Sequence, residues 1–171
     1  MKYFLLLLLS INIQAQLLLS PFDAMTLHFS QEAKIEKNNI LLTTDEAKSV
    51  SKLAKSKLKT KIYKTFRATK DGELLGWGIL VLHKVRSKDT AILSIISPNG
   101  TLKTIEIIAF NEPIEYLPSK SWIEVLNNKT LNPDLALGKD IPSITAATMS
   151  ARAATMSARI ALSIFEIKFK K

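Results

Sequence analysis

The segment from Thr145 to Lys168 constrains the fold most, because nearly seven helical turns of chain contain neither glycine nor proline. This composition predicts one long C-terminal helix. Within the segment the unit Ala-Ala-Thr-Met-Ser-Ala-Arg occurs twice in direct tandem, at 146–152 and 153–159. Seven residues make almost two helical turns. A second copy therefore lengthens the helix while nearly preserving its faces.

The middle of the chain predicts an antiparallel meander of about four strands. Two dipeptides, Asp71-Gly72 and Asn99-Gly100, are typical of tight hairpin turns. The segments around them are rich in β-branched and large apolar residues. The expected strands are 61–69, 74–85, 90–96 and 102–110.

A helix is expected before the meander, over about residues 43–58. Thr43 and Glu46 have the spacing of a capping box, and apolar residues then recur at helical spacing. A short helix is also expected over 119–126, ahead of the long C-terminal one. Helices at both ends of one antiparallel sheet define an α+β fold, and 171 residues suit a single domain.

The N-terminus has the pattern of a secretory signal peptide. One lysine, Lys2, precedes the apolar run 3–9, and Ala15 offers a small residue for cleavage. We therefore expect a signal peptide at 1–15, an N-terminal extension at 16–42 and the folded domain at 43–171. The run is short for a membrane span. The apolar residues 17–19 nevertheless leave an uncleaved membrane anchor as an alternative.

Composition excludes several kinds of site. The chain has no cysteine, which rules out disulfides, thiolate metal sites and cysteine nucleophiles, and its two histidines make a histidine-rich metal site improbable. The net charge is +9, with lysines densest over 48–64, but no run of aromatic residues interleaves with them as nucleic-acid binding would require. The charge instead favours an anionic membrane surface or a redox partner.

The line Leu137-Gly-Lys-Asp-Ile-Pro-Ser-Ile-Thr-Ala-Ala-Thr148-Met-Ser-Ala-Arg152 resembles the attachment region of the FMN-binding domain family. That family includes the flavinylated subunits of sodium-pumping quinone reductase and of the Rnf complex, and many small exported proteins. Its motif is a hydroxyl residue, Gly, Ala and the acceptor Thr, followed two places later by Ser or Thr. The stretches Gly76-Trp-Gly, Phe110-Asn-Glu-Pro and Tyr116-Leu-Pro-Ser-Lys-Ser-Trp122 extend the likeness over about residues 60–165.

The resemblance implies covalent FMN on Thr148, attached from FAD by a separate flavin transferase. Thr145, Ala147 and Ser150 fill the other motif places, Arg152 lies one helical turn beyond the acceptor to pair with the phosphate, and Glu112 is a further candidate contact. A helix N-terminus would help to hold the phosphate, and Pro142 with the Ser143 and Thr145 hydroxyls suits such a start. Trp77, Tyr116 and Trp122 are candidates for stacking on the flavin ring, although each is more often a packing residue.

Two positions depart from the family pattern. Ala146 stands where the family has Gly, and Pro142 stands where an acidic residue is frequent, with Asp140 as a substitute two places earlier. Alanine is unfavourable at position 146 if positive φ is required, and harmless if the position is helical. Thr155 in the second repeat is the other candidate acceptor. We favour Thr148, because Thr155 is expected to lie inside the helix.

Electron transfer is the leading functional hypothesis, with a membrane oxidoreductase as donor and an exported protein as acceptor. No acid–base constellation indicates a stand-alone enzyme. The alternative is a non-redox exported binding or structural module whose flavin site is degenerate. A flavin-dependent reductase with its own small substrate is a third hypothesis.

Overall fold

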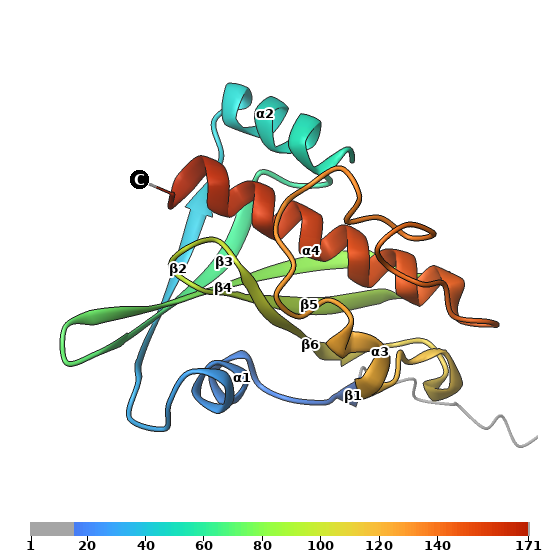
Figure 1. The fold of residues 1–171 in the computed structure, drawn as a ribbon, viewed down its shortest axis with the longest axis horizontal. Helices are drawn as coiled ribbons and strands as arrows, with labels where there is room; N and C mark the ends of the chain where they lie inside the picture. The colour runs from blue at the N-terminus through green and yellow to red at the C-terminus, as the bar shows by residue number, and fades with distance from the viewer. Residues whose placement is uncertain (1–15, 171) are drawn as a thin grey trace, which may run out of the picture.

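The computed structural model describes residues 16–170, which form one antiparallel sheet with helices on both faces (Figure 1). The predicted signal peptide lies outside the described residues. In chain order the elements are β1 (Gln16–Leu17), α1 (Pro21–His28), β2 (Lys34–Leu41), α2 (Thr44–Ala54), β3 (Ile62–Lys70), β4 (Glu73–Lys84), β5 (Asp89–Ile96), β6 (Leu102–Phe110), a 3-10 turn (Ile114–Tyr116), α3 (Lys120–Glu124) and α4 (Thr148–Lys168).

The sheet has six strands in the order β1-β6-β5-β4-β3-β2, all paired antiparallel. The predicted meander is confirmed as its four central strands, and the predicted α+β class is confirmed with it. Both predicted hairpin turns are present, and Asp71, Gly72 and Gly100 have the positive φ that such turns use. The sequence did not predict β2 or α1, which place most of the segment 16–42 within the fold.

The predicted capping box at the start of α2 is also confirmed. The Thr43 hydroxyl accepts a hydrogen bond from the Glu46 N–H at 3.2 Å, and the Glu46 carboxylate accepts one from the Thr43 N–H at 2.8 Å. The helix ends at Ala54, because Lys55 takes up the left-handed conformation with φ of 54°. This early end sends residues 55–61 across the molecule toward β3.

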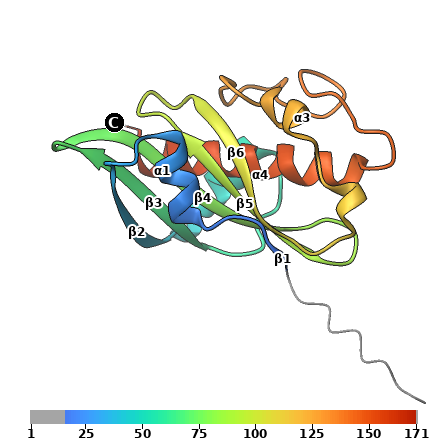
Figure 2. The same cartoon turned by 90° about the horizontal axis from the view of Figure 1, so that it is seen from below.

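Helix α4 lies across one face of the sheet, with α2 packed on its outer side, and α1 covers part of the opposite face (Figures 1 and 2). Because α4 lies between the sheet and α2, it is buried on most sides. The helix meets its neighbours through small residues at helical spacing, since Ala151, Ala154, Ala158 and Ala161 are all fully buried. A smaller core beneath α1 includes Met25, Phe66 and Leu93.

A buried arginine joins α4 to its surroundings. The Arg159 guanidinium donates four hydrogen bonds of 2.8 to 2.9 Å to the backbone carbonyls of Leu53, Ala54, Asn132 and Leu135. These carbonyls belong to the end of α2 and to the irregular segment before α4. Burial lowers the pKa of Arg159 from its ordinary value. One side chain thus fixes three parts of the chain relative to each other.

We predict that Arg159→Met destabilises the protein by about 3 kcal/mol, because it leaves buried carbonyls without donors. Arg152 occupies the same place in the other repeat but is exposed, so Arg152→Met is the matched control and is expected to cost less than about 0.5 kcal/mol. Urea unfolding of both variants provides the measurement. Equal losses would show that the hydrogen bonds of Arg159 do not stabilise the fold.

Candidate functional site

Thr148 is the first residue of α4 and is exposed. Its hydroxyl donates a hydrogen bond to the Ile144 carbonyl at 2.9 Å, and the same carbonyl accepts a bond from the Ala147 N–H at 3.2 Å. These two contacts close a tight turn just before the helix. The hydroxyl is thus held in a defined place at the surface.

The helix begins about three residues later than its composition predicted. Its N-cap is Ala147, which is buried and provides no side-chain hydrogen bond. The expected capping roles of Ser143 and Thr145 are therefore wrong: Ser143 precedes the turn, Thr145 lies within it, and both are exposed. The first N–H groups of a helix have no partner within the helix. Because no side chain caps them here, they and the positive end of the helix dipole are available to an anion at Thr148.

Ala146 has a φ of 65°, which is the left-handed conformation that glycine favours. It is the position at which the resembling family has glycine. Position 146 is therefore not helical, and its backbone conformation requires positive φ. Alanine in this conformation costs about 1–2 kcal/mol relative to its ordinary backbone states.

The second copy of the repeat has a different environment. Thr155 is buried, and its hydroxyl donates to the Ala151 carbonyl inside the helix at 2.8 Å. Its N–H lies in the third turn of α4, where backbone donors already have helical partners. Of the two threonines, only Thr148 therefore combines an exposed hydroxyl with a helix N-terminus.

Ser150 and Arg152 follow Thr148 along the first two turns of α4. Ser150 is buried, and its hydroxyl has no hydrogen-bond partner within residues 16–170. Arg152 is exposed and lies four residues beyond Thr148, on the same side of the helix. The guanidinium is thus free of the carbonyl contacts that hold Arg159.

A cavity of about 330 Å³ runs beside α4 from Arg152 onward, and we name it the α4 cavity. Four of its lining residues come from α4, and they lie on the same side of that helix as Thr148: Arg152, Thr155, Met156 and Arg159. Met156 lies about 12 Å along the axis from Thr148. The cavity is lined by Lys55, Pro133, Ala136, Leu137, Lys139, Arg152, Thr155, Met156 and Arg159. Its walls are apolar and its charged groups are all cationic.

Glu112 forms its hydrogen bonds at the turn between β4 and β5. One carboxylate oxygen accepts from the N–H groups of Arg86, Ser87 and Lys88 at 3.0, 2.6 and 2.8 Å. The bond from Lys88, followed by those from Ser87 and Arg86, lowers the pKa of Glu112 from its ordinary value. The contacts therefore give Glu112 a structural role at this turn, and none connects it to Thr148.

The three aromatic candidates have partners within the protein. The Trp77 ring stacks on Phe169 with centroids 4.0 Å apart, and the Trp122 indole donates to the Pro142 carbonyl at 2.9 Å. The Arg86 guanidinium lies 4.9 Å from the Tyr116 ring centroid. Packing therefore accounts for the placement of each ring.

The acidic residue proposed as a substitute for the family pattern is also paired. The Asp140 carboxylate lies 3.7 Å from the Lys129 ammonium. This contact holds the segment before α4 close to Leu102 on β6, because the Lys129 carbonyl accepts the Leu102 N–H at 2.9 Å. The structure thus gives Asp140 a place in the support of the turn.

Other kinds of site receive no support from residues 16–170. No group of three or more His, Asp and Glu side chains is placed to hold a metal ion. No helix in that range has the length and hydropathy to cross a bilayer.

Among solved structures, the described fold matches the crystal structure of Shewanella oneidensis NqrC with a TM-score of 0.56. The match covers 79% of this chain and 82% of that chain, at 15% sequence identity. No protein-family model matches the sequence, and no curated protein matches it. The chain has the NqrC fold, and this confirms at the level of the fold the resemblance that its sequence shows to FMN-binding domains.

We predict that Ala146→Gly stabilises the protein by about 0.5–1 kcal/mol. Relief of the left-handed conformation exceeds the entropy that glycine gains in the unfolded chain. The matched control is Ala153→Gly, at the same place in the other repeat but buried within α4, which is expected to cost about 1 kcal/mol. Denaturant midpoints measure both changes. Destabilisation by Ala146→Gly would contradict the assigned backbone conformation.

We predict that Glu112→Gln destabilises the protein at neutral pH and that the difference from wild type shrinks in acid. The folded pKa is lowered, so the contribution of the carboxylate is present above the ordinary value of 4.5 and is lost as pH falls through the folded value. Thermal unfolding between about pH 7 and pH 3 measures the difference. Glu115→Gln, an exposed change nearby, is expected to show no such trend.

Proposed function

We propose that this chain carries FMN covalently on Thr148 and acts as an electron carrier. The observation that supports this most strongly is an exposed threonine hydroxyl at an uncapped helix N-terminus, two residues after a backbone position with positive φ. The fold match to NqrC adds support to the sequence resemblance, because the resembling family includes the flavinylated subunits of sodium-pumping quinone reductase. Attachment, the linkage and the redox role are all part of the proposal.

The attachment step follows from the chemistry of the hydroxyl. With FAD as donor, the Thr148 oxygen attacks the phosphorus of the flavin phosphate, the bond to the bridging phosphate oxygen breaks, and AMP leaves. The hydroxyl proton is released, and a phosphodiester remains. A separate flavin transferase carries out this step and requires an accessible acceptor. Exposure of Thr148 satisfies that requirement, whereas burial of Thr155 does not.

The residues around Thr148 suit the parts of FMN. The free N–H groups of the first turn and the Arg152 guanidinium would hold the phosphate. The α4 cavity would take the ring against its apolar wall, which includes Leu137 and Met156. Lys55 and Lys139 add positive charge there, and cations close to a flavin favour its anionic reduced form. The bound flavin would supply the electron transfer.

Export and the redox partners belong to the same proposal. The N-terminal pattern supports transport out of the cytoplasm, into the periplasm in a cell that has one. A membrane oxidoreductase would then supply electrons and an exported protein would accept them. The +9 charge would steer the protein toward acidic partners or an anionic membrane surface. On this view the chain is a carrier rather than a stand-alone enzyme.

The alternative, a non-redox exported module with a degenerate flavin site, has one observation in its favour. Ala146 keeps the left-handed conformation without the glycine that would make it favourable. A chain that had lost its flavin would no longer need glycine at this turn, so its replacement by alanine would be tolerated. The two functions differ in whether the acceptor hydroxyl becomes modified, so a direct test of modification separates them.

We predict that intact mass spectrometry after co-expression with a flavin transferase shows one FMN-sized adduct on the wild-type chain. Thr148→Ala is expected to abolish the adduct, and Thr155→Ala is expected to keep it. Thr148→Ser retains a hydroxyl at the same place and is expected to remain modified. Circular dichroism of each variant controls for folding.

Two outcomes would overturn the assignment. Loss of the adduct in Thr155→Ala alone would move the linkage to the second repeat. Absence of any adduct on wild type, under conditions in which the transferase modifies a known substrate, would favour the non-redox module.

A further inference from the structure

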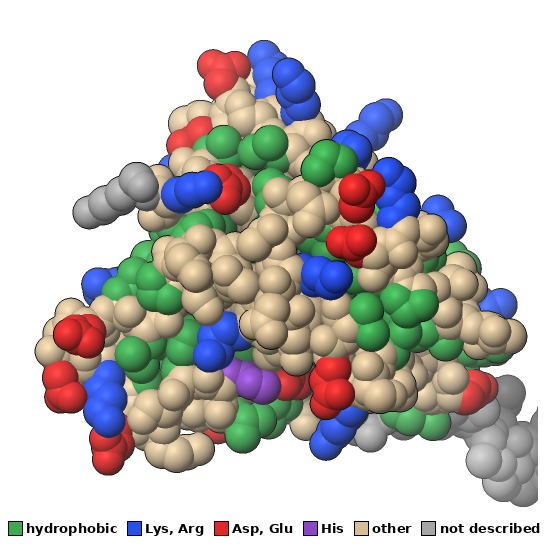
Figure 3. Space-filling model, viewed as in Figure 1, with side chains coloured by type: hydrophobic (Ala, Val, Ile, Leu, Met, Phe, Trp, Pro, Cys, Tyr) green, Lys and Arg blue, Asp and Glu red, His purple; other side chains and the backbone are tan. Residues whose placement is uncertain are grey.

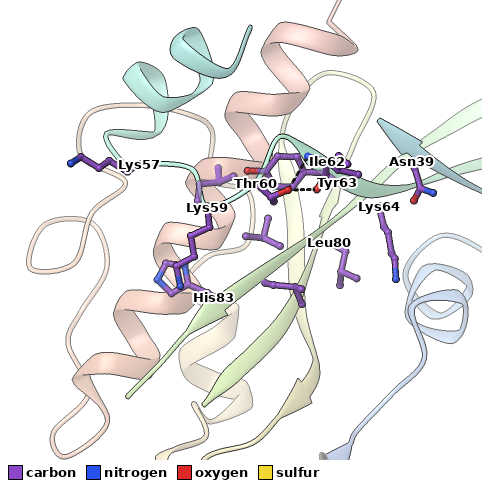
Figure 4. A pocket seen from close by; sticks show the side chains of 12 residues that line it. Asn39, Lys57, Lys59, Thr60, Ile62, Tyr63, Lys64, Leu80 and His83 are labelled. Atoms are coloured by element: carbon purple, nitrogen blue, oxygen red, sulfur yellow. Dashed lines mark hydrogen bonds between the residues drawn. The ribbon is translucent and has the colours of Figure 1, made fainter. Parts of the chain in front are cut away.

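A second cavity, of about 300 Å³, lies where β3 separates from β4, and we name it the β3–β4 cavity (Figure 4). The ladder between these strands ends at the pair Lys64–Leu80, although β4 continues to Lys84. The first residues of β3 pair with β2 instead. The two strands therefore diverge, and the connection 57–61 passes over the gap between them.

The cavity is mainly apolar. Its lining includes three side chains that are more than nine-tenths buried, those of Tyr63, Val81 and Ile160. Two aliphatic side chains, Ile62 and Leu82, also line it but are 59% and 64% exposed. The volume is at the lower end of the range for small-molecule sites. An apolar interior whose lining continues into exposed aliphatic side chains suits a narrow hydrocarbon group.

The charged groups that line the cavity are all basic. Lys57, Lys59 and Lys64 are lining residues, and no Asp or Glu is among them. The Lys57 and Lys64 side chains point outward on opposite sides of the cavity (Figure 4). In Figure 4 the Lys59 side chain extends toward His83 on β4. Burial, with a smaller contribution from the charge of Lys59, lowers the pKa of His83. No described carboxylate of the lining balances these cations, so an anion would be attracted here.

Tyr63 adds a polar group to the apolar interior. Its side chain is 5% exposed, and its hydroxyl forms no hydrogen bond with any residue in the range 16–170. Burial raises the pKa of this hydroxyl, so it remains protonated and able to donate. Because Tyr63 lines the cavity, this hydroxyl can donate a hydrogen bond to a ligand atom beside it.

From these features we infer that the β3–β4 cavity binds an amphipathic anion, with an aliphatic chain inside and a carboxylate or phosphate head beside Lys59, which extends toward His83 (Figure 4). The ligand could be a free fatty-acid-like molecule or one chain of an anionic lipid, which share this chemistry. The site is separate from the proposed flavin. Ile160 lies about 18 Å along α4 from Thr148, and Thr148 does not line this cavity.

The first test is titration calorimetry with hexanoate, octanoate and decanoate, on protein made without a flavin transferase. Affinity is expected to rise about fourfold for each added methylene until the cavity is filled. Decylamine has the same chain as decanoate with an opposite head charge and is expected to bind much more weakly. Nuclear magnetic resonance shifts of Tyr63 and His83 locate the ligand. Equal affinity for decanoate and decylamine, or shifts only elsewhere, would overturn the proposal.

Two pairs of variants separate this site from general surface binding. Lys59→Gln is expected to weaken decanoate binding about fivefold, and Lys120→Gln, an exposed change on α3, to leave it unchanged. Leu82→Ser is expected to weaken it too. Leu27→Ser on α1 is the matched control, because Leu27 and Leu82 are 63% and 64% exposed. If each pair behaves alike, the cavity is not the site.

Vesicle sedimentation distinguishes the two sources of the ligand. Binding to phosphatidylglycerol-containing vesicles but not to pure phosphatidylcholine, with loss in Leu82→Ser, indicates an anionic lipid. Decanoate binding without vesicle binding indicates a free amphiphile. Either result is independent of flavin attachment. Failure of both arms would refute this inference and would leave the Thr148 assignment intact.

Discussion

The position of α4 depends on the buried guanidinium of Arg159. Its four hydrogen bonds connect the C-terminal end of α2 and the segment before α4 to one point on the helix. Those carbonyls lie outside regular ladders and would otherwise be buried without donors. The α4 cavity forms beside this contact, and Arg159 is part of its lining. The candidate site therefore depends on an interaction more than two helical turns away from Thr148.

The same interaction explains why two identical sequence units take different structures. Residues 160–168 are unique, and they pack in the core through Ile160, Leu162, Ile164 and Phe165. This fixes the register of the second copy, whose arginine fills the carbonyl site. The first copy must then form the N-terminal end of α4, about 10 Å further along the helix axis. Ala146 and Ala153 are followed by the same six residues, yet one is left-handed and the other is helical.

Much of the fold could be predicted from local signals, because those signals coincide with the tertiary structure. The capping box at Thr43, the Asp71-Gly72 turn and the apolar strands all specify local geometry directly. Strand β2 was missed because Lys34–Leu41 is mainly exposed and polar, and it is a strand only because β3 lies beside it. Likewise, no local pattern shows that Glu112 receives three N–H groups from a turn about 25 residues earlier.

The candidate site was predictable in part, for a similar reason. The motif placed the acceptor at Thr148, and the structure leaves that hydroxyl exposed at a helix start. The cap was misplaced because the turn at Ile144–Ala147 is closed by backbone and Thr148 contacts rather than by Ser143 or Thr145. The cavity could not be predicted, since Lys55, Pro133 and Leu137 meet Met156 only through the long-range packing around Arg159.

Several of the dense lysines of 48–64 line the two cavities in the folded chain. Basic side chains project around α2 at the top of the molecule (Figure 3). The left-handed residue Lys55 ends α2 and lines the α4 cavity, while Lys57 and Lys59 just beyond it line the β3–β4 cavity. One short connection thus supplies cations to both cavities. The interaction between charges weakens with distance and solvent screening, so cations that border a cavity attract anions to it more strongly than distant ones. Because the connection borders both cavities, it makes each attractive to anions without burying an unpaired charge.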